Sequence, residues 1–224
     1  MVLEDLRVVA FTVEMALVAT AAVLVPGVAA ALLLARYRGP GRSALDTLLS
    51  LPLVLPPTAV GLALLELLGA RRPLGRWLGT HGLEIVFTWK AVVLATAVMS
   101  FPLLVRQART AFEDVDPRLV GLARTLGCSP LAAFFRVTLP LARRGVLAGT
   151  VLAFSRALGE FGATILVAGN IPGRTQTLAL RIFQEVQAGR DERAATLAGL
   201  TAALAFLALW SADRIGRRAR ERAP

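Results

Sequence analysis

The strongest constraint on this sequence is a series of long apolar runs, each close to the length needed to cross a membrane as a helix. The clearest run, Met15 to Ala35, contains no charged residue. About 20 apolar residues suffice for one helical crossing of a hydrocarbon layer roughly 30 Å thick. With 56% hydrophobic residues and a mean hydropathy of +0.65, the chain is too apolar for an ordinary soluble domain. The sequence therefore predicts an all-α integral membrane protein.

Five runs are expected to cross the membrane as a polytopic helical bundle, in a single transmembrane domain that takes up residues 1–224. They are Met15–Ala35, Thr47–Leu65, Ile85–Val105, Pro140 or Leu141 to Ala168, and Ala194–Ala212. Three prolines interrupt the second run, which predicts a broken helix that lines a pathway or a hinge, although simple packing explains it equally well. Gly145 and Gly149 predict a close approach of the fourth span to another helix. A sixth span would be added if Leu178–Val186 also crosses.

The arginines in the connecting segments predict the orientation of the spans. The net charge is +10, and the basic residues are spread between the apolar runs instead of gathered on one soluble face. The membrane rule for positive loops explains this better than binding to nucleic acid. A basic turn follows the first run and a basic tail follows the last, containing Arg36, Arg38 and Arg42 in the turn and Arg214, Arg217, Arg218, Arg220 and Arg222 in the tail. We expect the N-terminus outside and the C-terminus in the cytoplasm, with Arg71–Gly82 as an external loop whose three arginines count against this topology.

A polar-edged loop, about residues 106–140, interrupts the apolar runs and is expected to form a cytoplasmic helical hairpin. Asp116 is a good N-cap before Pro117, Gly127 can take the left-handed conformation that ends a helix, and Ser129 starts a second helix. Both helices carry apolar stripes, made of Leu119, Leu122, Ala123 and Leu126 in the first and Leu131, Phe134 and Phe135 in the second. The hairpin needs a surface to dock on. The alternative is an amphipathic connector that lies at the lipid headgroups.

The spacing of residues in this hairpin resembles the loop signature of binding-protein-dependent ABC importer permeases: Glu-Ala-Ala, three residues, Gly, nine residues, Ile, any residue, Leu-Pro. Ala123, Gly127 and Val137 match it in register, followed by Leu139 and Pro140, whereas Gly121 stands in place of the acidic residue. In that family the hairpin is the coupling helix, which sits in a cleft of the ATPase subunit. The resemblance implies a docking surface made of Leu119, Gly121, Leu122, Ala123, Arg124, Thr125, Leu126, Gly127 and Ser129.

Two charged residues, Arg156 and Glu160, fall within the fourth predicted span. Each costs roughly 2.5 to 3.5 kcal/mol at the membrane centre on insertion scales, so they must be compensated. Four residues apart, they share a helical face and can form an ion pair that only stabilises the bundle. We favour the other interpretation, that this face borders an aqueous route. Several polar residues that follow suit transient contact with an oxyanion, namely Asn170, Arg174, Thr175, Gln176 and Thr177.

The same region resembles the permeases of molybdate importers, through Ser155–Thr164 (SRALGEFGAT), Gly169–Thr177 (GNIPGRTQT) and Leu51–Gly61 (LPLVLPPTAVG). Sulfate and thiosulfate permeases share a close relative of the Gly-Glu-Phe-Gly segment. The resemblance implies alternating-access import of molybdate, with tungstate as co-substrate, by a homodimer in the inner membrane of a prokaryote. It also implies two cytoplasmic ATPase subunits that hold ATP and Mg, an external oxyanion-binding protein, and a translocation pathway containing Arg156, Glu160, Gly162, Thr164, Asn170, Thr175 and Thr177.

The sequence gives no support to an enzyme active site. The phosphate loop GxxxxGK[ST] is absent and the sole lysine, Lys90, lies on a span, so the chain is not expected to be the ATPase or to bind a cofactor. Cys128 and His81 are the only residues of their types and have no partners at metal-ligand spacing. Three alternatives remain open: a sulfate or thiosulfate permease, an ion-coupled secondary transporter that uses Arg156 and Glu160 as a relay, and a membrane-embedded enzyme or structural anchor.

Overall fold

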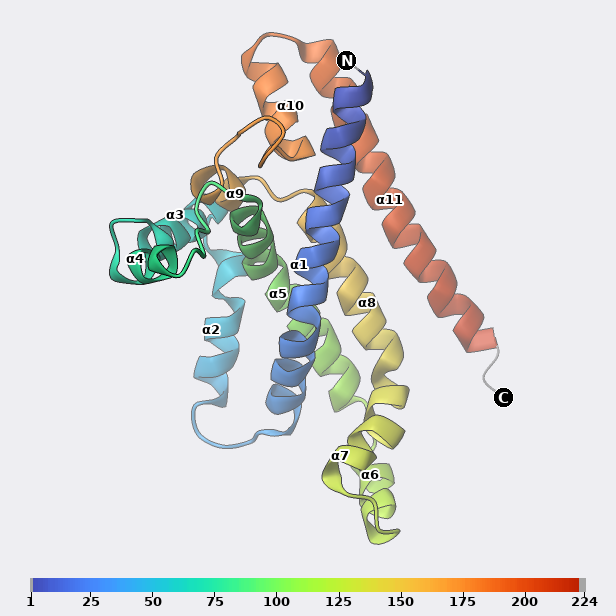
Figure 1. The fold of residues 1–224 in the computed structure, drawn as a ribbon. Helices are drawn as coiled ribbons and strands as arrows, with labels where there is room; N and C mark the ends of the chain where they lie inside the picture. Colours follow the sequence, from blue (N-terminus) through green and yellow to red (C-terminus); the bar gives the residue numbers. More distant parts are fainter. Residues whose placement is uncertain (1, 222–224) are drawn as a thin grey trace.

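The computed structural model describes the backbone of residues 2–221 and the side chains of residues 3–210, and the regular structure in this range is helical (Figure 1). In chain order the elements are α1 (Val2–Arg36), α2 (Arg42–Val54), α3 (Pro57–Leu68), α4 (Pro73–Thr80), α5 (Trp89–Glu113), α6 (Pro117–Thr125), α7 (Pro130–Ala133), the π-helical segment η1 (Phe134–Thr138), α8 (Leu139–Leu158), α9 (Gly162–Val167), α10 (Leu178–Gln187) and α11 (Asp191–Glu221). The predicted all-α fold is confirmed. Arg222 of the predicted basic tail, and the side chains of its other arginines, lie outside the described residues.

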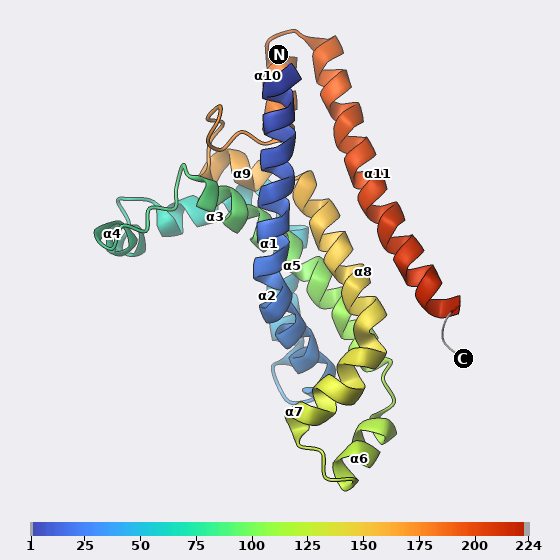
Figure 2. The ribbon, with the colours of Figure 1, turned by 45° about the vertical axis from the view of Figure 1, so that its right-hand side comes forward.

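The long helices run between two ends of an elongated bundle. The N-terminus and α10 lie at one end, and α6 and α7 lie at the other (Figures 1 and 2). Among the described residues, four segments are long and apolar enough to cross a membrane, namely Leu3–Arg36, Trp89–Glu113, Pro130–Leu158 and Asp191–Trp210, and the bent pair α2–α3 makes a fifth if it counts as one span. The predicted five spans agree with this range. α10 has 10 residues and rises only about 15 Å, too little to add a sixth crossing.

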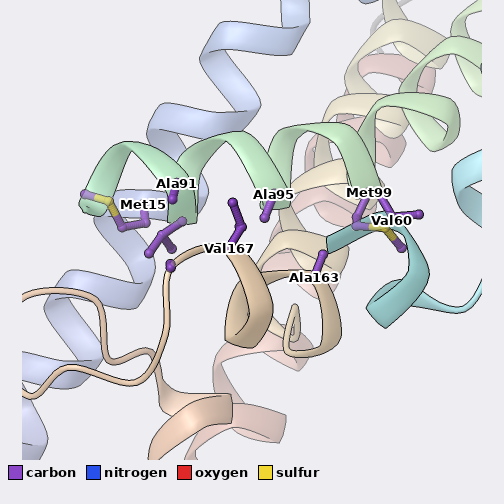
Figure 3. Close-up of a cluster of buried hydrophobic side chains, with 9 residues drawn as sticks. Met15, Val60, Ala91, Ala95, Met99, Ala163 and Val167 are labelled. Carbon is purple, nitrogen blue, oxygen red and sulfur yellow. The ribbon is translucent and has the colours of Figure 1, made fainter. Parts of the chain in front are cut away.

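Small residues let the central helices pack closely. α5 lies between α1 and α8, and a Cβ atom added at Gly145 of α8 would lie 2.2 Å from Cβ of Ala111 on α5. At Gly149 it would lie 3.0 Å from Cβ of Gln107. The close approach predicted from this glycine pair is therefore confirmed. Nearer the N-terminal end, α1, α3, α5 and α9 share an apolar cluster whose labelled members are Met15, Val60, Ala91, Ala95, Met99, Ala163 and Val167 (Figure 3).

Two predicted spans are broken, one as expected and one not. The chain bends by 108° between α2 and α3, and the break falls at Leu55 and Pro56, which are extended because a proline follows each of them. The fourth span was expected to continue to Ala168, and this was wrong. α8 ends at Leu158, and α9 begins four residues later. The expected external loop 71–82 also differs from the prediction, because it contains the short helix α4.

Candidate functional site

The first helix of the hairpin, α6, begins and ends as its residues predict. The Asp116 side chain accepts a hydrogen bond of 2.8 Å from the backbone N–H of Arg118. At the other end Gly127 has φ +88°, and the N–H of Cys128 reaches back to the carbonyl of Ala123 at 3.0 Å. This bond closes a Schellman turn, which needs the left-handed conformation that glycine adopts without strain. The turn gives α6 a defined length and sends the chain back toward the bundle.

The second helix of the hairpin leads without interruption into the membrane. Ser129 caps α7 by accepting a hydrogen bond of 3.2 Å from the N–H of Ala132. The chain then continues through η1 into α8. Phe134 anchors this junction, because its ring lies 6.1 Å from the ring of Phe112 near the end of α5. The hairpin is therefore fixed to two long helices, α5 and α8.

The apolar face of the hairpin is uncovered in this chain. Leu126 is 84% exposed and Leu122 is 59% exposed, and Leu119, Leu131 and Phe135 are exposed as well. A Cβ atom added at Gly121 would meet nothing within 4 Å. Phe134 is the member of the predicted stripe that packs against the bundle instead of facing outward. Contiguous exposed apolar side chains of this kind mark surfaces that bind a partner.

The predicted ion pair lies where α8 gives way to α9. Nη2 of Arg156 and Oε2 of Glu160 are 2.7 Å apart, a contact that lacks hydrogen-bond alignment. The other carboxylate oxygen, Oε1, accepts a hydrogen bond of 2.8 Å from the N–H of Ala163. Glu160 therefore neutralises the arginine and also caps the first turn of α9. Its side chain is only 1% exposed, whereas that of Arg156 is 29% exposed.

The broken spans contact each other through two glycines. A Cβ atom added at Gly162 of α9 would lie 2.7 Å from Cβ of Pro57, at the start of α3. One added at Gly61 of α3 would lie 2.7 Å from the carbonyl oxygen of Ala163. The breaks at residues 55–56 and 159–161 thus meet at one tight crossing. Beside it, the fully buried hydroxyl of Thr164 has no hydrogen-bond partner among the described residues.

The polar residues that follow α9 are held mainly by each other. Nε2 of Gln176 donates to Oδ1 of Asn170 at 2.9 Å and to Oε1 of Gln184 at 2.6 Å. The hydroxyl of Thr175 accepts a hydrogen bond from a backbone N–H at 3.0 Å, and Thr177 caps α10. Both threonines are buried, so their hydroxyls support the loop. Of this polar set, Arg174 is exposed and lines a pocket of about 740 Å³.

A buried acidic residue of α10 escaped the sequence analysis. The carboxylate of Glu185 is fully buried, with Nε of Arg181 at 2.9 Å and Nε of Arg190 at 2.5 Å. The hydrogen bond from Arg190 is the main reason why the pKa of Glu185 lies below its ordinary value, and burial opposes this shift. Arg193 adds a contact of 3.8 Å and reaches Asp5 of α1 at 3.0 Å. The spacing of four residues between Arg181 and Glu185 could have predicted their ion pair from the sequence. No sequence signal indicates the contact between Arg193 of α11 and Asp5 of α1.

An uncovered hairpin on two membrane-crossing helices, together with a glycine-tight crossing of two broken spans, defines a multi-span permease that works with another subunit. The chain belongs to the family described as "Binding-protein-dependent transport system inner membrane component", whose model matches residues 27–221. It is thus a multi-pass inner-membrane permease of an ABC transporter and not the ATPase itself. Membership implies an ATPase and a binding protein as partners. It decides against the ion-coupled secondary transporter and the membrane-embedded enzyme.

Curated relatives support the predicted resemblance. The chain is 47% identical over 199 residues to the molybdenum transport system permease protein ModB of Escherichia coli, covering 88% of this chain and 87% of that protein. It is 43% identical to the protein of that name in Haemophilus influenzae, over 83% and 82%. Identity to the sulfate transport system permease protein CysT of Escherichia coli is 37%, over 86% and 71%.

Solved structures share the fold at low sequence identity. A chain of the MetNI methionine ABC transporter, in inward-facing conformations, matches with a TM-score of 0.75 over 97% of both chains at 18% identity. A chain of a bacterial alginate ABC transporter matches with a TM-score of 0.72 at 16% identity, over 96% of this chain and 79% of that one. The architecture is therefore that of an ABC importer permease.

Proposed function

We propose that this chain is the membrane permease of an ATP-driven molybdate importer that also carries tungstate. The observation that carries the proposal is the 47% identity to a molybdenum permease across nearly the whole chain, compared with 37% to a sulfate permease. The chain works as a homodimer with two ATPase subunits, which hold ATP and Mg²⁺, and an external oxyanion-binding protein delivers the substrate. The N-terminus lies outside and the C-terminus in the cytoplasm, since the arginine-rich hairpin then faces the ATPases.

The hairpin is the part of the chain that binds the ATPase. Its exposed leucines offer an apolar surface at the end of two membrane-crossing helices, and its caps fix that surface in shape. Closure of the ATPases around ATP moves the two hairpins of the dimer, and the spans attached to them turn so that the pathway opens outward. Because position 121 is a glycine, this surface has no acidic group there, and the ATPase can approach the backbone closely.

The pathway passes the break between α8 and α9. Arg156 is the accessible charge there, because Glu160 is buried beneath it and Gly162 is used for packing. A single guanidinium that is already paired with a carboxylate attracts an oxyanion without holding it tightly. Four other residues of the predicted pathway shape its wall, namely Thr164, Asn170, Thr175 and Thr177. The polar groups of Asn170, Thr175 and Thr177 already form hydrogen bonds within the chain, so these residues support the wall and do not bind the anion directly.

The substrate is tested with the complex of permease, ATPase and binding protein in proteoliposomes. We expect ATP hydrolysis to be stimulated by binding protein loaded with molybdate or tungstate, and not by the unliganded protein. Transport of the same anions is measured in parallel. Stimulation by sulfate alone would overturn the substrate and favour a sulfate permease.

The docking role is tested by placing a charge on the apolar face of the hairpin. Complete burial of a leucine contributes about 1.5 to 3 kcal/mol, so Leu126→Glu is expected to weaken binding of the ATPase roughly 10- to 100-fold and to abolish stimulated hydrolysis. Leu74→Glu is the matched control, because Leu74 is an exposed leucine of α4, and this helix lies far from α6 and α7 in both views (Figures 1 and 2). Full coupling in the Leu126 variant would rule out this docking surface.

A further inference from the structure

A basic pocket lies where the membrane-crossing helices meet the docking hairpin. It measures about 820 Å³ and is lined by three arginines at the α1–α2 connection, Arg36, Arg38 and Arg42. Its apolar wall comes from the end of α5, the turn that follows and α6, and contains Phe112, Val115 and Val120. Arg36 is the last residue of α1, and the last residue of α5 also lines the pocket. Both helices end a membrane-crossing segment here. The pocket is therefore at the depth of the lipid headgroups.

Glu113, the carboxylate among the residues that line the pocket, is already paired. Nη2 of Arg42 lies 2.8 Å from Oε1 of Glu113, and Nε of Arg109 lies 2.9 Å from the same oxygen. Arg109 also contacts Asp46 at 2.9 Å. Two arginines and two carboxylates thus neutralise each other across α2 and α5. Glu113 is therefore shared by Arg42 and Arg109, and no described carboxylate lies within ion-pair distance of Arg36 or Arg38.

Those remaining arginines have no anionic partner in the described part of the chain. Arg36 donates a hydrogen bond of 3.0 Å to the hydroxyl of Thr138, which is a neutral acceptor. Arg38 is exposed and makes no hydrogen bond or ion pair with the described residues. The pocket thus presents two guanidinium groups that have no counter-ion among the described residues, next to an apolar wall. A ligand that satisfies both features must carry an anionic group attached to an apolar body.

We propose that this pocket binds the phosphate headgroup of an anionic phospholipid. Guanidinium groups match phosphate oxygens in a two-pronged geometry, and basic pockets between span ends on the cytoplasmic side bind anionic headgroups. The apolar wall receives the glycerol and the first acyl carbons. Because Pro117 and Val120 of α6 also line the pocket, a bound lipid ties the docking hairpin to the α1–α2 turn. A free oxyanion shares the phosphate chemistry but leaves the apolar wall bare.

The test measures phospholipid retained by the assembled complex of permease and ATPase. Native mass spectrometry follows binding of phosphatidylglycerol and phosphatidylcholine to the wild type, to the double variant Arg36→Gln/Arg38→Gln, and to Arg136→Gln/Arg143→Gln as control. Arg136 and Arg143 are exposed arginines near the same end of the bundle that do not line the pocket. We expect affinity for phosphatidylglycerol to fall roughly 25-fold in the pocket variant, since each basic group contributes about a fivefold factor.

The control is expected to retain phosphatidylglycerol like the wild type, and phosphatidylcholine is expected to bind weakly to all three. Arg36→Lys/Arg38→Lys keeps the charge and should recover most of the binding, which separates loss of the site from misfolding. Equal retention by the glutamine variant would overturn the proposal. Displacement of the lipid by inorganic phosphate or molybdate would assign the pocket to free oxyanions instead. Crosslinking of position 38 to the ATPase, with no retained lipid, would assign it to the partner protein. None of these outcomes depends on which anion is transported.

Discussion

Replacing Arg156 by Gln should destabilise the protein more than replacing its partner, because the two charges are buried to different extents. Without the arginine, the Glu160 carboxylate stays buried with only the backbone bond to Ala163 for support. Removing one partner of a buried ion pair costs about 3 to 5 kcal/mol of stability. Because the hydrogen bond from Ala163 to Glu160 remains, we expect Arg156→Gln to cost about 3 kcal/mol, at the lower end of this range. The converse change, Glu160→Gln, keeps an oxygen to cap α9. It leaves an arginine that is 29% exposed and can reach water, so its cost is about 1 kcal/mol.

The double variant Arg156→Gln/Glu160→Gln contains no unpaired buried charge and should recover most of the lost stability. A coupling free energy of about 2 to 3 kcal/mol is therefore expected from the double-mutant cycle. The assay is unfolding of the complex in detergent for all four proteins, followed by molybdate transport in proteoliposomes. If Arg156 borders the pathway, the double variant regains stability but not transport. If the pair is only structural, it regains both.

Two results would refute this reasoning. Equal destabilisation by the two single changes would show that burial does not decide the cost. A double variant as unstable as Arg156→Gln would show that the pair does not compensate the buried charge.

Two further predictions concern packing and pH. Gly162→Ala should cost about 1 to 3 kcal/mol of stability, because the new methyl group would meet Pro57. Gly159→Ala is the control and should leave the stability nearly unchanged, because a Cβ atom there has nothing within 4 Å. Unfolding of the two variants in the same detergent checks this, and equal stability would contradict the tight crossing. Glu185→Gln should cost about 2 kcal/mol near neutral pH. The hydrogen bond from Arg190 lowers the pKa of Glu185 in the folded state, so this stabilisation is present above the ordinary value of 4.5 and disappears as the pH falls through the lowered pKa. A difference in stability between the variant and the wild type that does not change with pH would contradict this prediction.

The hairpin could be predicted from the sequence because its structure depends on near neighbours. Asp116, Gly127 and Ser129 act on backbone groups within a few residues, so the identity and spacing of the residues were enough. The end of α8 could not be predicted from hydropathy. The apolar run continues through the break, and hydropathy does not register a change of backbone direction. Glu160 was interpreted as a charge inside a span, whereas it lies in the break after α8 and its carboxylate caps the first turn of α9.

The contacts between distant segments could not be predicted from one sequence. Arg193 and Asp5 are 188 residues apart, and Arg36 and Thr138 are 102 residues apart. Each residue alone is an ordinary polar group near the end of a helix. The arginines of the α1–α2 turn were explained by the positive-loop rule, which predicts the side of the membrane but not which arginines have a counter-ion. Only the folded arrangement separates Arg42, which is paired, from Arg38, which has no ion-pair partner among the described residues.

The position of the breaks relative to the hairpin explains how the two can be connected mechanically. α7, η1 and α8 form one helical path from Pro130 to Leu158, so the hairpin and the Arg156–Glu160 pair lie at opposite ends of a single rod. The glycines of α8 pack this rod tightly on α5, to which the other end of the hairpin is attached. A displacement of the hairpin must therefore move α5 and α8 together. The short helices α3 and α9 lie beyond the breaks, where the chain can change direction, and relative movement is expected to concentrate at residues 55–56 and 159–161.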